Sequence, residues 1–113
     1  MSSVDGLRGY PMPGGGAYAE AKHGVLGLTK SAALEYAATG VRITAVCPGW
    51  VATPPVTRWM ERDAKAAAAI VGQTPRGRIA SADEIANAVL GLCSDAASFM
   101  IGSPLVVDGG YMA

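Results

Sequence analysis

The chain has 113 residues, a length that allows one domain at most. Half of its residues are apolar and 16% are charged, a balance that indicates a buried core and excludes a disordered chain. Nine basic and nine acidic residues cancel, so the sequence carries no electrostatic footprint for nucleic acid or for an anionic membrane. We therefore expect no nucleic-acid partner and no membrane partner.

The cysteines and the apolar runs narrow the class further. No apolar run approaches the roughly 20 residues that a membrane-spanning helix needs, and no signal-peptide pattern opens the sequence. Cys47 and Cys93 stand in apolar contexts far apart, so we expect two buried free thiols in a reducing, cytoplasmic compartment. One histidine and no cluster of Cys or His predict that the chain holds no metal site.

A loop rich in Gly and Pro precedes a long helical segment. The loop runs from Gly9 to Gly16 and includes Pro11 and Pro13. From Ala17 to Thr39 apolar residues recur at helical spacing, and Gly40 is placed to end the helix. The predicted apolar stripe consists of Val25, Leu28, Ala32 and Tyr36, widened by Leu26, Ala33 and Ala37.

A buried strand is predicted next, over Val41 to Cys47, because this stretch is β-branched and mostly apolar. A Pro-Gly pair ends the strand. Residues from Trp50 to Pro55 are predicted to form a loop, those from Val56 to Val71 a helix, and those from Gly72 to Ala80 a second loop.

The last third of the chain predicts a capped helix and a short strand. Ser81 with Glu84 three residues later fits a capping box, and the helix that it opens is expected to end near Ser94. Leu105 to Val107 is predicted to be a strand. The order helix, strand, helices, strand indicates an α/β fold with parallel crossovers, in which ligands bind beyond the carboxyl ends of the strands.

Tyr18 and Lys22 lie four residues apart at the start of the long helix, so they share one face with Cβ atoms roughly 5–6 Å apart. An ordinary tyrosine has a pKa of about 10, and a cation within about 4–6 Å favours the phenolate. The pair is chemically suited to proton transfer. On spacing alone, a packed tyrosine beside a solvated lysine explains it better.

Five features occur in a set order along the whole chain. They are Ser2-Ser3-Val4-Asp5-Gly6, the Tyr18–Lys22 pair, Val41–Gly49 with Thr53 four residues on, Arg78 followed by Asp83-Glu84-Ile85-Ala86, and Val107-Asp108-Gly109-Gly110. Together they resemble the C-terminal catalytic half of a short-chain dehydrogenase/reductase. The resemblance implies the C-terminal part of a Rossmann-type doubly wound parallel sheet, with about two strands and three to four helices, and residues 1–113 as half of a single domain.

The resemblance also implies roles for particular residues. Tyr18 is the general acid/base that exchanges a proton with the substrate oxygen, and Lys22 favours its phenolate and binds the nicotinamide ribose. Ser3 holds the substrate oxygen. Ser2 is an equally good candidate by chemistry, but the position of Ser3 in the family's motif favours Ser3. The cofactor-binding residues implied in addition to Tyr18 and Lys22 are Pro48, Gly49, Val51 and Thr53. The interval from Ser3 to Tyr18 is longer than the family commonly shows, through extra Gly and Pro residues.

The activity implied by the resemblance is hydride transfer between NAD or NADP and a small-molecule alcohol or carbonyl, in a homodimeric or homotetrameric enzyme. The sequence does not choose between NAD and NADP, because it holds no Gly-rich turn that follows a strand and opens a helix. We expect Met1 to be an internal methionine and the chain to be a fragment, marginally stable and inactive alone, with an open strand edge. The alternative is an inactive remnant that associates with full-length relatives.

The segment after the buried strand is expected to form the substrate pocket. Trp50, Val56 and Met60 are expected to line or cover it rather than to take part in the chemistry. The charged side chains of this segment, Arg58, Arg62 and Lys65, are expected on an exposed face.

Overall fold

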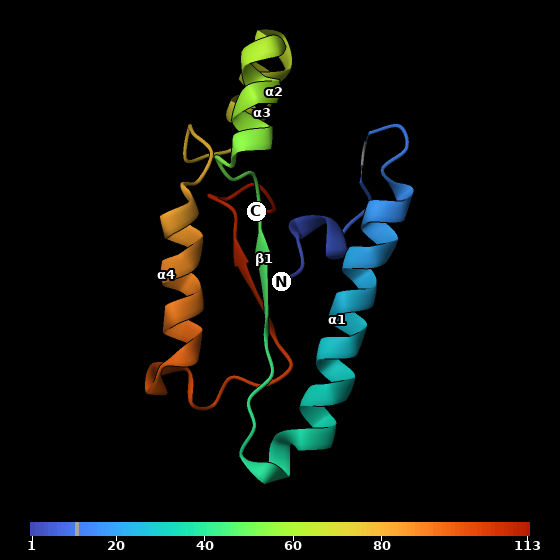
Figure 1. The fold of residues 1–113 in the computed structure, drawn as a ribbon, viewed down its shortest axis with the longest axis vertical. Coiled ribbons are helices and arrows are strands. Elements are labelled where there is room, and N and C mark those ends of the chain that lie inside the picture. The colour runs from blue at the N-terminus through green and yellow to red at the C-terminus, as the bar shows by residue number, and fades with distance from the viewer. Residues whose placement is uncertain (11) are drawn as a thin grey trace.

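A two-stranded parallel sheet with one long helix on each face forms the body of the molecule (Figure 1). The computed structural model describes residues 1–10 and 12–113, so Pro11 of the predicted Gly/Pro loop lies outside the described residues. β1 (Ala45–Pro48) pairs in register with β2 (Pro104–Val107). α1 (Gly16–Tyr36) and α4 (Ala82–Cys93) cover opposite faces. The predicted α/β class is confirmed.

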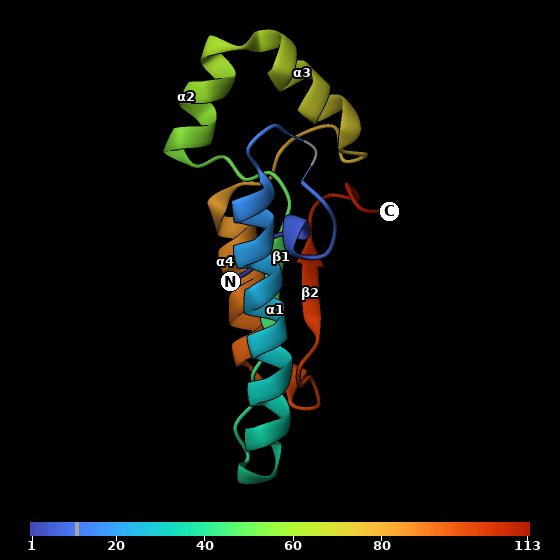
Figure 2. The same ribbon diagram turned by 90° about the vertical axis from the view of Figure 1, so that its right-hand side faces the viewer.

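Two shorter helices lie beyond the carboxyl ends of the strands. α2 (Pro54–Arg62) and α3 (Ala64–Gln73) form an arch over that end of the molecule (Figure 2). Three 3₁₀ turns complete the fold: η1 (Val4–Gly6), η2 (Ala37–Thr39) and η3 (Asp95–Ala97). In this part of the chain the predicted single helix is wrong, because the chain breaks at Asp63.

The break and the start of α2 have local causes. Asp63 leaves the helical conformation and its Oδ1 accepts a hydrogen bond from the Ala66 N–H at 2.9 Å, so it caps α3. Pro54 and Pro55 were predicted to lie in a loop, but they form the first turn of α2. Proline is well suited to that position because its φ is already helical and its missing N–H has no helical partner there.

β1 is shorter than the sequence predicted. The structure begins the strand at Ala45 rather than Val41, because its partner β2 begins at Pro104, opposite Ala45. Upstream of β1, the Gly102 N–H donates to the Ile43 carbonyl at 2.8 Å, and Val41 is exposed. On its other edge β1 accepts a bond at 2.9 Å from the Ser2 N–H to the Val46 carbonyl. The N-terminal turn is thereby tied to the strand.

The strand is buried on both faces, as predicted, because its alternate residues pack against opposite helices. One core cluster contains Val46, Ile85, Leu92 and Ala97, and the other contains Leu26, Ala45 and Cys47. Burial raises the pKa of the Cys47 thiol, although a hydrogen bond with Ser2 acts in the opposite direction. The prediction for Cys93 is wrong: it is exposed, because α4 turns Ile85 and Leu92 toward the core.

α1 turns inward the widening side of the predicted stripe rather than its centre, since Leu26 and Ala33 are buried as predicted. Its buried residues are Leu26, Thr29 and Ala33, whereas Leu28 is 70% exposed. Thr29 can be buried because its hydroxyl donates to the Val25 carbonyl at 2.8 Å. The helix continues into η2, and Gly40 ends it with φ +82°, as predicted. No helix in the described part of the chain is long and apolar enough to cross a membrane.

The predicted capping box is confirmed at the start of α4. The Ser81 hydroxyl accepts from the Glu84 N–H at 3.3 Å, and the Glu84 carboxylate accepts from the Ser81 N–H at 2.8 Å. Arg78 adds two bonds of 2.8 Å to the same carboxylate. Bonding to Arg78, followed by bonding to the Ser81 N–H, lowers the pKa of Glu84 from 4.5 to about 2.

This shift makes the contribution of Glu84 to stability depend on pH. Because the pKa is depressed in the folded state, the contribution is complete above about pH 4.5 and is lost as the pH falls toward 2. In the protein expressed from the gene's complete reading frame, Glu84→Gln should lower the thermal midpoint at neutral pH, and the two midpoints should converge by about pH 2. Asp83→Asn, in the same helical turn, is the matched control and should cause a smaller change. A difference that does not depend on pH would contradict the assignment.

Candidate active site

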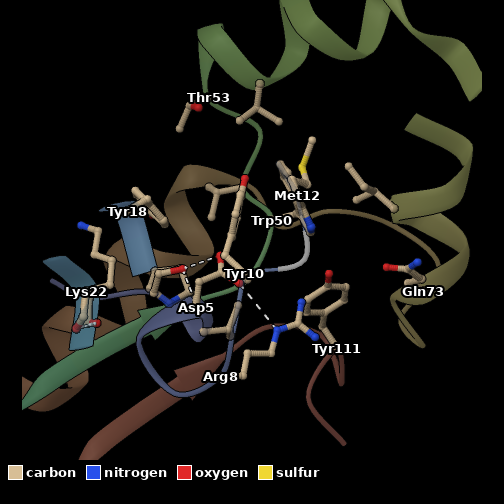
Figure 3. A pocket seen from close by; sticks show the side chains of 18 of the residues that line it. Asp5, Arg8, Tyr10, Met12, Tyr18, Lys22, Trp50, Thr53, Gln73 and Tyr111 are labelled. Carbon is tan, nitrogen blue, oxygen red and sulfur yellow. Dashed lines mark hydrogen bonds and ion pairs between the residues drawn. The ribbon is translucent and has the colours of Figure 1, made fainter. Parts of the chain in front are cut away.

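A cavity of about 590 Å³ lies between the carboxyl end of β1 and the helices α2 and α3 (Figure 3). Its lining includes every residue that the sequence predicted for the site, namely Ser3, Tyr18, Lys22, Pro48, Gly49, Val51 and Thr53. Trp50 and Val56 also line it, as expected. Met60 is not among the described residues that do so, although α2 carries it.

Tyr18 and Lys22 come from the first two turns of α1. The Lys22 Nζ lies 5.4 Å from the centroid of the Tyr18 ring, the close placement that their four-residue spacing predicted. Tyr18 is 46% exposed, so its phenol is accessible from the cavity. Glu20 is exposed, and His23 is exposed with its Nδ1 2.8 Å from the Ala19 carbonyl. Neither residue lines the cavity.

The N-terminal turn brings Ser2 and Ser3 to the same cavity. The turn packs closely on α1 at Gly6, where an added Cβ would lie 2.7 Å from the Lys22 carbonyl oxygen. The Ser2 hydroxyl donates to that same carbonyl at 2.8 Å. Gly6 and Ser2 thus fix the distance between this turn and the helix that carries Tyr18. Both contacts join residues far apart in sequence.

The two serines differ in what occupies their hydroxyls. The Ser2 hydroxyl is used to bond the α1 backbone. The Ser3 hydroxyl caps the short η1 turn, where its oxygen accepts from the Asp5 N–H at 3.1 Å and it donates to the Asp5 carboxylate at 3.3 Å. A 3.3 Å bond between hydroxyl and carboxylate is long, so the Ser3 hydrogen can turn toward another acceptor. Of the two, Ser3 is the one free to bind a ligand oxygen.

The end of β1 supplies the opposite wall. Gly49 passes so close to Asp108 that an added Cβ would lie 2.8 Å from the Asp108 Cβ, which explains the glycine after Pro48. Val51 forms a parallel bridge with Ala80, which holds the following loop in place. Thr53 is the residue that precedes α2, in an extended conformation. The residues predicted to contact a nicotinamide therefore lie along one continuous segment.

The sequence did not reveal a second group of lining residues. Arg8, Tyr10, Trp59, Gln73 and Tyr111 line the cavity as well. The Arg8 guanidinium lies 4.3 Å above the Tyr111 ring, and its Nε is 3.6 Å from the Asp5 carboxylate. Burial, then the nearby Asp5 carboxylate, raises the pKa of Tyr10 above its ordinary value, so this phenol remains neutral. The concentration of the few aromatic residues near the motifs is the signal that could have found this group.

Comparison with known proteins gives a consistent family. The model for the family described as enoyl-(acyl carrier protein) reductase matches residues 1–112. The short-chain dehydrogenase RED2 of Pyricularia oryzae is 50% identical over 93 residues, which are 82% of this chain and 34% of that protein. The cis-4-hydroxycyclohexanecarboxylate dehydrogenase of Sinomonas cyclohexanicum is 49% identical over 96 residues, 85% of this chain and 37% of that protein.

A solved structure agrees with the sequence matches. ElxO, solved with NADP bound, superimposes with a TM-score of 0.86 at 32% identity, over 98% of this chain and 44% of that one. The chain thus spans less than half the length of these similar proteins. From the family match over almost every residue, together with these similarities, we conclude that the chain belongs to the short-chain dehydrogenase/reductase family.

Proposed function

We propose that the chain is the catalytic half of a NAD(P)-dependent oxidoreductase that interconverts small alcohols and carbonyl compounds. The observation that carries the proposal is the meeting of three separate segments at one cavity. The N-terminal turn brings Ser3, α1 brings Tyr18 and Lys22, and the segment after β1 brings the Pro48–Thr53 wall. Family membership and the similar dehydrogenases support the same reaction class.

The roles of the residues follow from their chemistry and placement. Tyr18 gives its phenolic proton to the substrate oxygen during reduction and takes it back during oxidation. Lys22, with its cation 5.4 Å from the ring centroid, stabilises the phenolate that forms between these events. The Ser3 hydroxyl turns from Asp5 to donate a hydrogen bond to the substrate oxygen, where negative charge develops.

The cavity walls fit the nicotinamide end of the cofactor. Pro48, Gly49, Val51 and Thr53 would lie against it, with Lys22 reaching its ribose. The close approach of Gly49 to Asp108 leaves no room for a side chain at position 49. When bound, the cofactor supplies a hydride to the carbonyl carbon in reduction and accepts it in oxidation. The protein's part is to hold the two reactants and to exclude water. The choice between NAD and NADP stays open.

We also propose that residues 1–113 form the C-terminal half of one Rossmann-like domain, and that the complete protein is a homodimer or a homotetramer. Apolar side chains that face solvent on α1 and α4 support the second proposal. Leu34 is 82% exposed, Leu28 70% and Leu90 67%. Burial of exposed apolar side chains of this kind by a second subunit is favourable, because it removes apolar surface from water.

The two neighbouring serines give a sharp test of the assigned roles. In the protein expressed from the complete reading frame, Ser3→Ala should lower kcat by about 10²–10³-fold, because it removes a donor to the developing charge. Ser2→Ala should leave kcat much nearer to wild type and lower the free energy of unfolding by about 1 kcal/mol, since it loses one bond to the α1 backbone.

The measurement is the absorbance of reduced nicotinamide, followed in both directions with NAD and with NADP, alongside thermal melting of each variant. The reverse pattern, a large loss of kcat in Ser2→Ala only, would move the role of Ser3 to Ser2. A folded wild-type protein that turns over neither cofactor with any tested alcohol or ketone would contradict the proposed function itself.

A further inference from the structure

Aromatic side chains in this protein gather at the cavity rather than in the core. The chain has two Trp, four Tyr and one Phe, and all of them except Tyr36 and Phe99 line the cavity. Those two are exposed. The two core clusters of the described residues are built from aliphatic side chains, Ala and Cys. Aromatic rings are the largest apolar surfaces a chain can offer, and here they are placed where a ligand can meet them.

Tyr10 is the ring held against the proposed acid/base. Its centroid lies 5.7 Å from that of Tyr18, with the planes inclined at 56°, a tilted aromatic pair. Tyr10 can reach this position because residue 15 is glycine: a Cβ at Gly15 would overlap the Tyr10 ring. Both residues belong to the Gly/Pro-rich stretch between Ser3 and Tyr18. The glycine at position 15 thereby allows a second ring to lie beside Tyr18 (Figure 3).

Rings from other segments complete the wall. Trp50, after β1, stacks on Trp59 of α2 with centroids 5.8 Å apart and an interplanar angle of 12°. Tyr111, after β2, is held by the Arg8 guanidinium above its ring. The stretch before α1, the segment after β1, α2 and the segment after β2 thus each bring an aromatic ring to one cavity. Each ring has a neighbour that limits its movement, so a ligand ring meets a wall that is largely organised before binding.

The charges at the cavity argue against a charged substrate body. Among the described lining residues the charged side chains are Asp5, Arg8 and Lys22. Asp5 and Arg8 face each other at 3.6 Å, so their charges largely offset one another. Lys22 stands beside Tyr18 and is assigned to that residue. At the described residues, a charged substrate would lose hydration and would meet only charges that already face another group.

We propose that the cavity selects uncharged substrates whose reacting carbon belongs to a ring, and that Tyr10 is the residue that determines this selection. The inference rests on the proposed function and extends it to a substrate class: cyclic secondary alcohols and cyclic ketones. In this arrangement the ring of the substrate packs one face against Tyr10 while the substrate oxygen reaches Tyr18. A cyclic substrate loses no rotation about bonds within its ring on binding. A linear substrate of the same size loses several, and it covers the aromatic face less completely.

The test compares cyclohexanol with 2-hexanol, a linear secondary alcohol with the same number of carbons. The protein expressed from the complete reading frame should oxidise cyclohexanol with the higher kcat/KM. Tyr10→Ala should lower kcat/KM for cyclohexanol by about ten-fold, mainly through KM, and should change that for 2-hexanol far less. Tyr10→Phe should retain the preference, because the ring face remains. Tyr36→Ala, which removes an exposed tyrosine of α1, is the matched control and should leave both values unchanged.

A second readout measures binding without turnover: saturation-transfer NMR signals of the two alcohols with wild type and Tyr10→Ala. Ring protons of cyclohexanol should show the stronger effect, and Tyr10→Ala should remove the difference. Equal kcat/KM values for the two alcohols in wild type, or an equal loss for both in Tyr10→Ala, would overturn the inference and leave the proposed function standing. If wild type oxidises neither alcohol, the proposed function is contradicted for alcohols of this size. The NMR comparison then decides the inference by itself, and equal signals would overturn it.

Discussion

Tyr18→Phe should reduce kcat by about 10²–10⁴-fold while cofactor binding is retained. The substitution removes a single oxygen and leaves the ring that packs against Tyr10 and lies near the Lys22 cation. Folding and the shape of the cavity should therefore persist, and the loss should fall on proton transfer. Steady-state turnover of the protein expressed from the complete reading frame, together with fluorescence titration of reduced nicotinamide, measures the two effects separately.

Tyr36→Phe is the matched control, because Tyr36 lies at the other end of the same helix, exposed to solvent. It should leave both turnover and cofactor binding unchanged. If Tyr18→Phe kept a turnover close to that of wild type, the general acid/base would have to be another group. If it lost cofactor binding in proportion to turnover, Tyr18 would be a binding residue only.

Gly6→Ala should have the second-largest effect, on activity and on stability together. The added methyl would lie 2.7 Å from the Lys22 carbonyl oxygen and 2.9 Å from the Lys22 carbonyl carbon, both backbone atoms that cannot swing aside. The N-terminal turn must then move away from α1, and it carries Ser3 with it. Overpacking of this kind costs about 1–3 kcal/mol, and a misplacement near 1 Å can cost about 10²-fold in rate.

Gly9→Ala tests whether the effect comes from the contact rather than from the loss of a glycine. Among the described atoms, nothing lies within 4 Å of a Cβ built at Gly9, and its φ is not positive. This variant should melt and turn over like wild type. Thermal melting and kcat for both variants measure the comparison. A Gly6→Ala protein with unchanged kcat would show that the position of the turn on α1 does not matter for catalysis.

The sequence was sufficient to predict the parts of the site whose chemistry depends on short spacing. Tyr18 and Lys22 meet because residues four apart on a helix share a face, and the Ser81–Glu84 box forms by the same local logic. The Pro48–Thr53 segment follows a strand that its β-branched apolar residues made recognisable. In each of these cases the residues that interact lie within one element or one loop.

The contacts that could not be predicted join residues distant in sequence. The Ser2 hydroxyl binds a carbonyl twenty residues away, and the Arg42 guanidinium reaches the Leu92 carbonyl fifty residues away at 2.7 Å. The approach of Tyr10 to Tyr18 depends on the path of a Gly/Pro loop, which no periodicity describes. Such contacts depend on tertiary packing, so the sequence pattern of a single segment does not predict them.

The inward face of α1 was predicted only in part, for a different reason. Apolar residues occur around most of this helix, so two stripes were available, and both have a helical spacing. The structure turns Leu26 and Ala33 to the sheet and leaves Leu28 exposed. Thr29 was not recognised as part of the buried stripe because it is polar. It can be buried only because its hydroxyl donates a hydrogen bond to a backbone carbonyl.

The central claim is that Ser3, Tyr18 and Lys22 act with a nicotinamide cofactor at one cavity. The most direct test supplies NADH or NADPH carrying deuterium at both positions of its hydride-donating carbon, with cyclohexanone and 2-hexanone as acceptors. We predict that the wild-type protein from the complete reading frame places deuterium on the alcohol carbon, detected by mass spectrometry, and that Tyr18→Phe transfers the label about 10²–10⁴-fold more slowly. If a cooperatively folded wild-type protein leaves the label on the cofactor with both ketones, the claim is contradicted.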